Sequence, residues 1–422
     1  MTVTRMLAER STRALEPEAD AYLRVLTLTN VAAGLGELGR PGRLVAGLPF
    51  DERRPADAAF LNAMQLHART QDDFHPGGRC HVGIAALAPT LALADRAGER
   101  TLQCLAAGYE VMCAAASAYS TVAQRRGYRP TGMFGPLGAA AAAAVALGLD
   151  VDGVANAVGL ASAMSAGTNQ SWVSGTDEWL LELGAAARAG VDAALLTEGG
   201  AVASPVAMEG PAGWARAFFD DPGATSLIEA LQTPKSRIVE VATKLHPVSG
   251  IAQVVTQLGC DLHDLVGTQV PQEVLVTMSE AEMAYPGSAN RGPFRSRSDA
   301  LMSVAFCVAC ALTDGIVALE RLENPNEPAL GDLIDRVKIA PSASMPESAA
   351  SVRVSVRDVV HEVSGQASSL LFPAWDQVES PALARRSEAP PEAVVRARAL
   401  LGAETVQAGA LAELLVRARH SL

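Results

Sequence analysis

Two histidines, two carboxylates and an arginine gather in the ten-residue segment DDFHPGGRCH, residues 72–81. An imidazole exchanges protons near neutral pH, and a neighbouring carboxylate can orient it or assist it. His81 stands where an apolar run begins, so we expect it in the first turn of a helix, beside backbone N–H groups that favour an anion. We predict that His81 is the acid/base and that Asp72 or Asp73 assists it. The alternative is that the histidines only cap or pack.

The same loop carries residues suited to binding a substrate. Pro76 biases His75 towards an extended backbone, and the two glycines that follow let a ligand approach the main chain. A carboxylate bound here would also meet Arg79. We therefore predict that His75 and Arg79 bind substrate. The spacing from His75 to His81 does not place both rings on one helical face, so we predict no metal site.

Three later segments add candidates for binding carboxylates. Thr131, in RPTGMFGPLG, places a hydroxyl near a helix start, and Arg129 or Tyr128 could line the same cleft. Lys244, in KLHPVSG, is a compact positive charge that could anchor a carboxylate. Arg291 opens the densest basic cluster of an acidic chain, and arginine binds carboxylates through two parallel hydrogen bonds. Each segment also has a purely structural interpretation, as a tight turn, a crossing between domains or a solvated loop.

The elements that must position these residues are mostly helices. Hydrophobic periodicity and capping signals indicate a large all-helical domain over residues 1–265. A smaller α+β domain should follow over 266–380, and the C-terminal helices, 381–422, should rejoin the helical body. The fold class is therefore mainly α. The helices expected in the first part are 57–68, 79–96, 99–124, 136–148, 151–166, 179–199 and 224–232.

Alternating apolar and polar residues indicate the strands of the smaller domain. The segments 272–279, 333–341 and 351–364 alternate as half-buried strands do, and an apolar helix is expected between them, from about 298 to 319. In the third segment Val352, Val354 and Val356 should share one face of the sheet.

The bulk composition narrows the class of protein. The 422 residues carry a formal net charge of −12 without a basic tract, which argues against binding nucleic acid or an anionic membrane surface. We expect no membrane span and no secretory signal. The six cysteines are scattered, several of them in apolar helical runs, which suits a reducing cytoplasm.

These motifs together resemble the MmgE/PrpD family, which includes 2-methylcitrate dehydratase, cis-aconitate decarboxylase and iminodisuccinate epimerase. The resemblance implies a large all-α domain with a smaller α+β lid, a homodimer, carboxylate-rich small-molecule substrates and no cofactor. It rests on five segments in order, DDFHPGGRCH (72–81), RPTGMFGPLGAAAAAAVALGLD (129–150), EWLLELGAAARAG (178–190), KLHPVSGIAQ (244–253) and YPGSANRGPF (285–294).

The chain departs from the family pattern at five positions. Thr70 and Phe74 replace an acid and a threonine of the histidine loop. Trp179 stands where relatives carry a lysine, and Glu182 where they carry a histidine. Gln253 replaces another histidine, while His246 is added nearby. The resemblance makes Trp179, His246 and Gln253 substrate-binding candidates, and Glu182 a second base if burial raises its pKa.

The expected function is that of a cofactor-independent lyase or isomerase. It would remove a proton next to a carbonyl or carboxyl group of a small, carboxylated substrate, leading to dehydration, isomerisation or epimerisation. The altered positions favour a less highly charged substrate than 2-methylcitrate. Two alternatives stay open: a decarboxylase of the same family, and a catalytically silent binding or scaffolding homologue.

Overall fold

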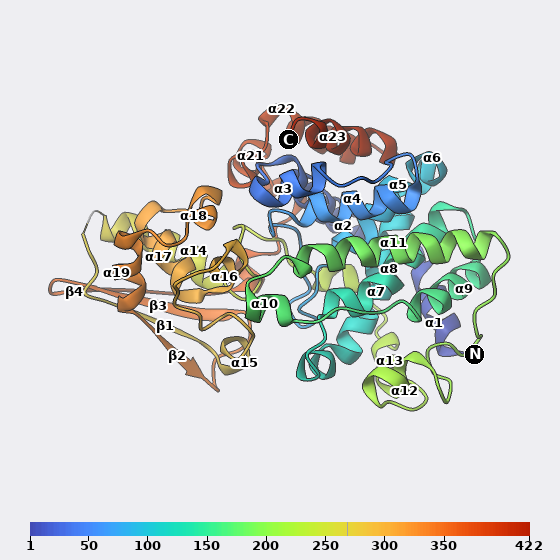
Figure 1. Cartoon of the computed structure of the whole chain (residues 1–422), viewed down its shortest axis with the longest axis horizontal. Coiled ribbons are helices and arrows are strands. Elements are labelled where there is room, and N and C mark those ends of the chain that lie inside the picture. Colours follow the sequence, from blue (N-terminus) through green and yellow to red (C-terminus); the bar gives the residue numbers. More distant parts are fainter. Residues whose placement is uncertain (268) are drawn as a thin grey trace. The chain divides into compact units, whose positions relative to one another are not determined.

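The computed structural model describes residues 1–267 and 269–422 (Figure 1). The described chain is mainly α-helical and holds a small four-stranded sheet. Its contacts divide it into a first unit, residues 1–168, 180–243 and 374–422, and a second unit, residues 169–179 and 244–373. The boundary expected at residue 265 falls inside the second unit, because the helix Gln253–Val266 packs on the sheet.

The first unit is built around three helices that pack on one another, α5, α7 and α8. Their facing surfaces are rich in alanine and glycine, so the helix axes come close together. The helices of this unit are α1 (Val3–Ser11), α2 (Pro17–Leu35), α3 (Gly39–Ala46), α4 (Pro55–His67), α5 (Val82–Ala92), α6 (Ala94–Ala97), α7 (Thr101–Arg125), α8 (Pro130–Ala146), α9 (Val151–Ser162), α11 (Glu178–Glu198, from residue 180), α12 (Trp214–Phe219), α13 (Thr225–Leu231), α21 (Ser380–Ser387), α22 (Pro391–Leu401) and α23 (Ala408–His420).

Helices are present at all seven places expected between residues 57 and 232, and two of them start three or more residues from the expected position. The helix expected at 79–96 is divided into α5 and α6. Helix α8 begins six residues early, at Pro130, because proline is well suited to the first helical position. Helix α5 begins three residues late, at Val82. Arg79 has a φ of 46° and His81 is extended, so neither continues a helix.

Gly108, where α7 meets α5, should not tolerate an added methyl group. A Cβ there would lie 2.7 Å from the Cβ and 2.8 Å from the Cα of Ala86. We expect Gly108→Ala to lower the free energy of unfolding by about 1–3 kcal/mol, the usual cost of overpacking. The matched control is Gly409→Ala in α23, where nothing lies within 4 Å. Urea denaturation should show the control at or above wild-type stability, and equal loss in both variants would contradict the packing argument.

The second unit contains the sheet, in the order β2-β1-β3-β4. Strands β1 and β2 are parallel, whereas β1–β3 and β3–β4 are antiparallel. Helix α14 packs on β3 and β4, and on α17. The elements are α10 (Gln170–Ser174), α14 (Gln253–Val266), β1 (Glu273–Ser279), α15 (Glu280–Met283), α16 (Arg297–Met302), α17 (Val304–Asp314), α18 (Leu319–Glu323), α19 (Pro328–Arg336), β2 (Val337–Ser342), β3 (Ala349–Val356), β4 (Val359–Gln366) and α20 (Ala367–Leu370).

Three expectations for this unit need correction. The segment 351–364 is a hairpin and not one strand, because the chain turns at Arg357, whose φ is 52°. The first half of 333–341 is the end of α19, whose apolar residues have helical spacing and are buried. The helix expected at 298–319 is split into α16 and α17 by extended backbone at Ser303. The predicted apolar face of β3 is confirmed, since Val352, Val354 and Val356 are all buried.

Among the described helices, none combines the length and apolar character needed to cross a membrane. All six cysteines are free thiols.

Candidate active site

The predicted histidine loop joins α4 to α5 in the first unit, and backbone pairs fix its shape. Phe74 pairs with Ala242 in both directions, at 3.0 and 2.8 Å, and the N–H of His75 donates to the carbonyl of Cys80 at 2.9 Å. Thr70 turns the chain back towards α4 with a φ of 56°. This turn carries the acids that follow it beneath the end of α4.

The carboxylate of Asp72 faces two imidazoles. Its Oδ1 lies 2.7 Å from Nδ1 of His67, the last residue of α4, and its Oδ2 lies 2.9 Å from Nδ1 of His81. His67 and Asp72 are fully buried, whereas the His81 side chain keeps 16% of its surface exposed. The Nδ1–H of His81 donates to the carbonyl oxygen of Asp73, at 3.3 Å. With that proton on Nδ1, the lone pair of a neutral His81 ring is on Nε2.

Burial and hydrogen bonding give His67 and Asp72 different charges. Burial, partly offset by Asp72, lowers the pKa of His67 to about 3, so this ring is neutral at physiological pH. Burial alone would raise the pKa of Asp72, but the two histidines that face it hold that pKa well below its ordinary value. The centre of the group is therefore an ionised carboxylate.

Arg129 and Glu182 continue the group beyond His67. The Nη2 of Arg129 lies 3.3 Å from Nε2 of His67, and its Nη1 donates to Oε2 of Glu182 at 3.2 Å. The other oxygen of Glu182 accepts from the N–H of Thr168 at 2.8 Å. One oxygen of Glu182 thus holds Arg129, and the other is bound to the backbone and fixes Glu182. Its role as a second base stays a prediction.

His67, Asp72 and His81 also form a set that could hold a metal ion, since one ligand atom from each lies within 4.8 Å of the others. The Arg129 contact argues against this use. A guanidinium only donates, so Nε2 of His67 must accept and Nδ1 must carry the ring proton. A metal at Nδ1 would require that proton to leave. The donor set therefore fits a hydrogen-bonded chain better than a metal site.

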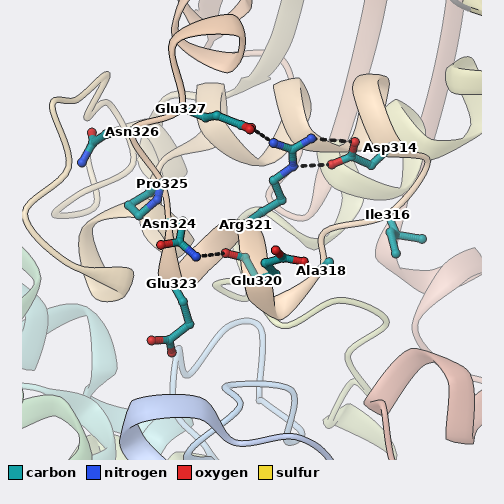
Figure 2. A pocket seen from close by; sticks show the side chains of 10 residues that line it. All are labelled: Asp314, Ile316, Ala318, Glu320, Arg321, Glu323, Asn324, Pro325, Asn326 and Glu327. Carbon is teal, nitrogen blue, oxygen red and sulfur yellow. Dashed lines mark hydrogen bonds and ion pairs between the residues drawn. The ribbon is translucent and has the colours of Figure 1, made fainter.

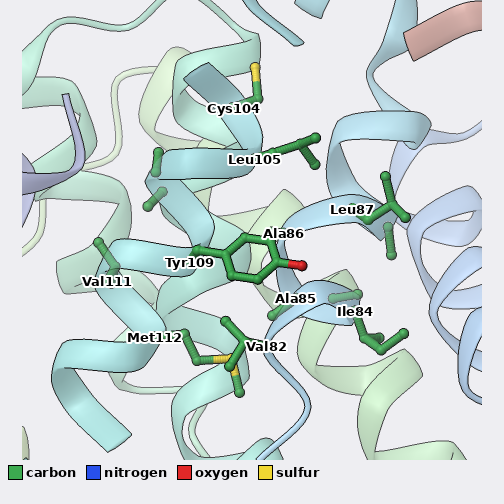
Figure 3. Packing of buried hydrophobic residues seen from close by; sticks show 14 of the residues in the cluster. Val82, Ile84, Ala85, Ala86, Leu87, Cys104, Leu105, Tyr109, Val111 and Met112 are labelled. Carbon is green, nitrogen blue, oxygen red and sulfur yellow. The ribbon is translucent and has the colours of Figure 1, made fainter. Parts of the chain in front are cut away.

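Asp73 lies on the other side of His81 and caps α5. Its Oδ1 accepts from the N–H of Gly83 at 2.8 Å, and its Oδ2 accepts from Asn30 at 2.9 Å and from the hydroxyl of Tyr109. Figure 3 shows the Tyr109 ring among apolar side chains of α5 and α7. Burial raises the pKa of Asp73 to about 7, against the lowering effect of these donors.

The expected anion site at the start of α5 needs correction. His81 is the N-cap residue and not a member of the first turn. The Asp73 carboxylate already occupies the N–H of Gly83, and the N–H of His81 donates to the hydroxyl of Thr131 at 3.1 Å. A substrate carboxylate would therefore not find these donors open. In this arrangement Asp73 and Thr131 fix the position of His81.

The other predicted residues of the loop have partners in the first unit. His75 accepts from the N–H of Gly78 through Nδ1, at 2.7 Å, so its Nε2–H faces Glu240 at 3.1 Å. Arg79 donates to Gln124 of α7 at 2.7 Å. Both contacts shape the loop, and the substrate-binding roles of His75 and Arg79 stay predictions.

A comparison with protein families gives a match that lies mostly in the first unit. Residues 27–227 match the family model described as the MmgE/PrpD N-terminal domain. This match places residues 27–227 in the MmgE/PrpD family. Members of that family are typically lyases or dehydratases, so a broad lyase- or dehydratase-type activity is implied for this chain. No curated protein matches the chain.

Two residues that depart from the usual MmgE/PrpD pattern are accounted for by loop geometry in the second unit. The side-chain amide of Gln253 accepts from the N–H groups of Leu245 and His246 and donates to the carbonyls of His246 and Val248. It therefore clamps the loop that follows Lys244. The ring of His246 contacts Gln257 at 3.1 Å. Their predicted substrate contacts, like that of Lys244, stay predictions.

Trp179 and Arg291, the last two MmgE/PrpD site candidates, also belong to the second unit. The ring of Trp179 stacks on Trp172, with centroids 5.7 Å apart. Arg291 donates to the carbonyls of Val337 and Ile334 at 2.8 and 2.5 Å, at the junction of α19 and β2. These contacts explain both side chains without a substrate, and their binding roles stay predictions.

The second unit also holds an acidic pocket of about 890 Å³ (Figure 2). Arg321 inside it is tied to Asp314 at 2.7 Å and to Glu327. None of the predicted site residues lines this pocket. A carboxylated substrate would meet net negative charge there, so we place no function in it.

Proposed function

We propose that the protein is a cofactor-independent lyase or isomerase that removes a proton next to a carbonyl or carboxyl group of a small, carboxylated substrate. The observation that supports this most directly is the buried Asp72 carboxylate, 2.7 and 2.9 Å from the Nδ1 atoms of His67 and His81. When His81 takes a proton, the resulting imidazolium would be stabilised by that fixed negative charge. His81 is thus the proposed acid/base, and Asp72 orients it.

The proposed first step moves one proton. The C–H bond of the substrate breaks, its proton goes to Nε2 of His81, and the electron pair remains on the substrate as an enolate. In a dehydration the enolate expels the β-hydroxyl group, which leaves as water after taking a proton. In an isomerisation or epimerisation the proton returns to another carbon or face. The alternative decarboxylation would release CO₂ first, and His81 would then protonate the carbanion.

We further propose that Lys244 anchors a substrate carboxylate. It stands two residues after Ala242, whose backbone pairs with Phe74 of the histidine loop. Two residues of chain span at most about 7 Å, so connectivity keeps the backbone of Lys244 near that pair. The buried ring of Phe74, where relatives carry a hydroxyl, supports a substrate less highly charged than a tricarboxylate.

Lys244→Ala should raise KM by about 10–100-fold with a smaller effect on kcat, because a uniform carboxylate contact binds ground state and transition state alike. The control is Lys338→Ala, which removes an exposed lysine paired with Glu273 on the sheet. Steady-state kinetics with the true substrate measure both. An unchanged KM in Lys244→Ala would remove this residue from the site.

The function itself is tested by incubating the wild-type protein with a panel of hydroxy and unsaturated mono-, di- and tricarboxylates in D₂O. NMR should show deuterium entering at the carbon next to a carboxyl group, or a new alkene, for at least one member. Binding without exchange or turnover across the panel would favour the alternative of a silent binding homologue. Light scattering on the same sample tests the homodimer that we expect from the family.

A further inference from the structure

Five side chains of the first unit form one continuous chain of contacts that ends at His81. Glu182 of α11 holds Arg129 at 3.2 Å, and Arg129 reaches His67 at 3.3 Å. His67 then contacts Asp72 at 2.7 Å, and Asp72 contacts His81 at 2.9 Å. The residues come from three helices and the loop between α4 and α5, so the chain exists only in the folded unit.

Only one arrangement of protons is consistent with this series of contacts. The guanidinium of Arg129 has donors and no acceptor, so Nε2 of His67 must hold a lone pair. The single ring proton of His67 is then on Nδ1, where it donates to Asp72. A second proton on His67 would have to displace Arg129. His67 can therefore orient Asp72 but cannot neutralise it.

We propose that Arg129 is a positioning residue that bars His67 from taking a proton, and so reserves the negative charge of Asp72 for the protonated form of His81. The proposal deepens the proposed function and rests on it, because it takes His81 as the reacting base. Asp72 has two imidazole neighbours. Burial already disfavours a second proton on His67, and Arg129 in addition occupies the ring nitrogen that would receive it, so only His81 can take a proton.

The surroundings of the chain agree with this role. The titratable and charged groups seen against His67 are Asp72, His81 and Arg129, and those seen against His81 are Asp72 and His67. Asp73 meets His81 through its main-chain carbonyl, while its carboxylate contacts Gly83, Asn30 and Tyr109. Burial is the first cause that lowers the pKa of His67 to about 3, and the charge of Arg129 acts in the same direction.

The fold also holds Arg129 firmly. Arg129 is the N-cap residue of α8, its N–H donates to the carbonyl of Gly167 at 3.2 Å, and its side chain is 3% exposed. The neighbouring backbone approaches closely because Gly132 has no side chain, since a Cβ there would lie 2.2 Å from the carbonyl oxygen of Ala166. The guanidinium is therefore placed by backbone contacts as well as by Glu182.

The test is an NMR titration of histidine rings in protein labelled with ¹³C and ¹⁵N histidine, which needs no substrate. In Arg129→Met the titration midpoint of His67 should rise, and that of His81 should fall by about one pH unit, because His67 then competes for Asp72. The direction is decisive. If Arg129 acted on His81 only through its own charge, removing that charge would raise the His81 midpoint.

A double variant separates the direct effect from the effect through His67. His67→Asn keeps an N–H for Asp72 but has no group that titrates in this range. In that background Arg129→Met should no longer lower the His81 midpoint. Glu182→Gln, which loosens Arg129 without removing it, should shift His81 in the same direction by less. It serves if Arg129→Met does not fold, provided it is compared with the same change in the His67→Asn background, because the loss of a negative charge alone also lowers the His81 midpoint. Arg96→Met, which breaks an exposed pair with Glu198, is the remote control and should leave both midpoints unchanged.

An unchanged or raised His81 midpoint in Arg129→Met, or an equal fall in the double variant, would overturn the proposal. Once a substrate is known, the acidic limb of the kcat/KM profile should move to lower pH with the His81 midpoint. If the midpoints behave as expected while no carboxylate in the panel is turned over, the proposed function fails and the proton assignment stands.

Discussion

His81→Gln should lower kcat by about 10²–10⁴-fold, the range that a positioned acid/base contributes. Glutamine keeps a polar group of similar length at the N-cap of α5, where the His81 side chain makes no capping hydrogen bond, so the helix should persist. Of the two imidazoles that face the Asp72 carboxylate, this substitution removes the one that is partly exposed. Turnover of the substrate identified in D₂O measures the loss.

His420→Gln is the matched control for that experiment. The His420 side chain is 67% exposed and faces Glu52 at 3.5 Å, so its loss should leave kcat at the wild-type value. Circular dichroism should show wild-type helix content for both variants. A His81→Gln protein that folds and retains wild-type turnover would show that the acid/base is another residue.

The stability of the first unit should depend on pH through two buried groups with opposite signs. The pKa of His67 is lowered from 6.5 to about 3, so the unfolded chain takes up a proton below pH 6.5 that the native protein refuses. His67 therefore destabilises the fold as pH falls from about 6.5 to 3. At 1.36 kcal/mol per unit the full effect is about 5 kcal/mol.

Asp73 acts in the other direction. Its pKa is raised from 3.8 to about 7, so the native protein keeps a proton that the unfolded chain has lost. The stabilisation that this proton gives to the native protein is lost as pH rises from about 4 to 7 and amounts to about 4 kcal/mol. Between pH 4 and 6.5 the two groups largely cancel in the wild-type protein.

Single variants should reveal how much each of the two groups contributes to the pH dependence of stability. In Asp73→Asn the urea midpoint, relative to wild type, should increase from pH 4 to 7, because the opposing carboxyl group is gone. In His67→Asn the midpoint relative to wild type should decrease over the same interval. Urea denaturation followed by helix content at pH 4, 5, 6 and 7 gives both curves. Curves parallel to wild type would show that neither group titrates differently in the native protein.

Much of the fold follows from local sequence patterns. Periodic apolar residues and Pro at first helical positions locate the helices of the first unit, and β3 shows its buried valines as an alternation. The hairpin at Arg357 could not be seen, because no Gly or Asn marks the left-handed turn residue. The end of α19 resembles a strand in the sequence, because the apolar run LIDRVKIA continues from the last turn of that helix into β2.

The sequence predicts only part of the candidate site. Asp72 and His81 stand out as a pair of proton-carrying residues within one loop, but His67 reads as the ordinary polar end of an apolar helix. Its role depends on a turn at Thr70 with a φ of 56°, a conformation that threonine rarely adopts. The partner of Arg129 is equally hidden, since Glu182 lies 53 residues further along the chain.

The pairing of Phe74 with Ala242 uses main-chain atoms only. The acids beside it are therefore held by hydrogen bonds that any residue except proline could make at position 74. A change of side chain there alters the lining of the loop while leaving Asp72 and Asp73 where they are. If the proposed function holds, position 74 is thus a place where a substitution would change the surface of the loop without moving the proposed proton-transfer groups.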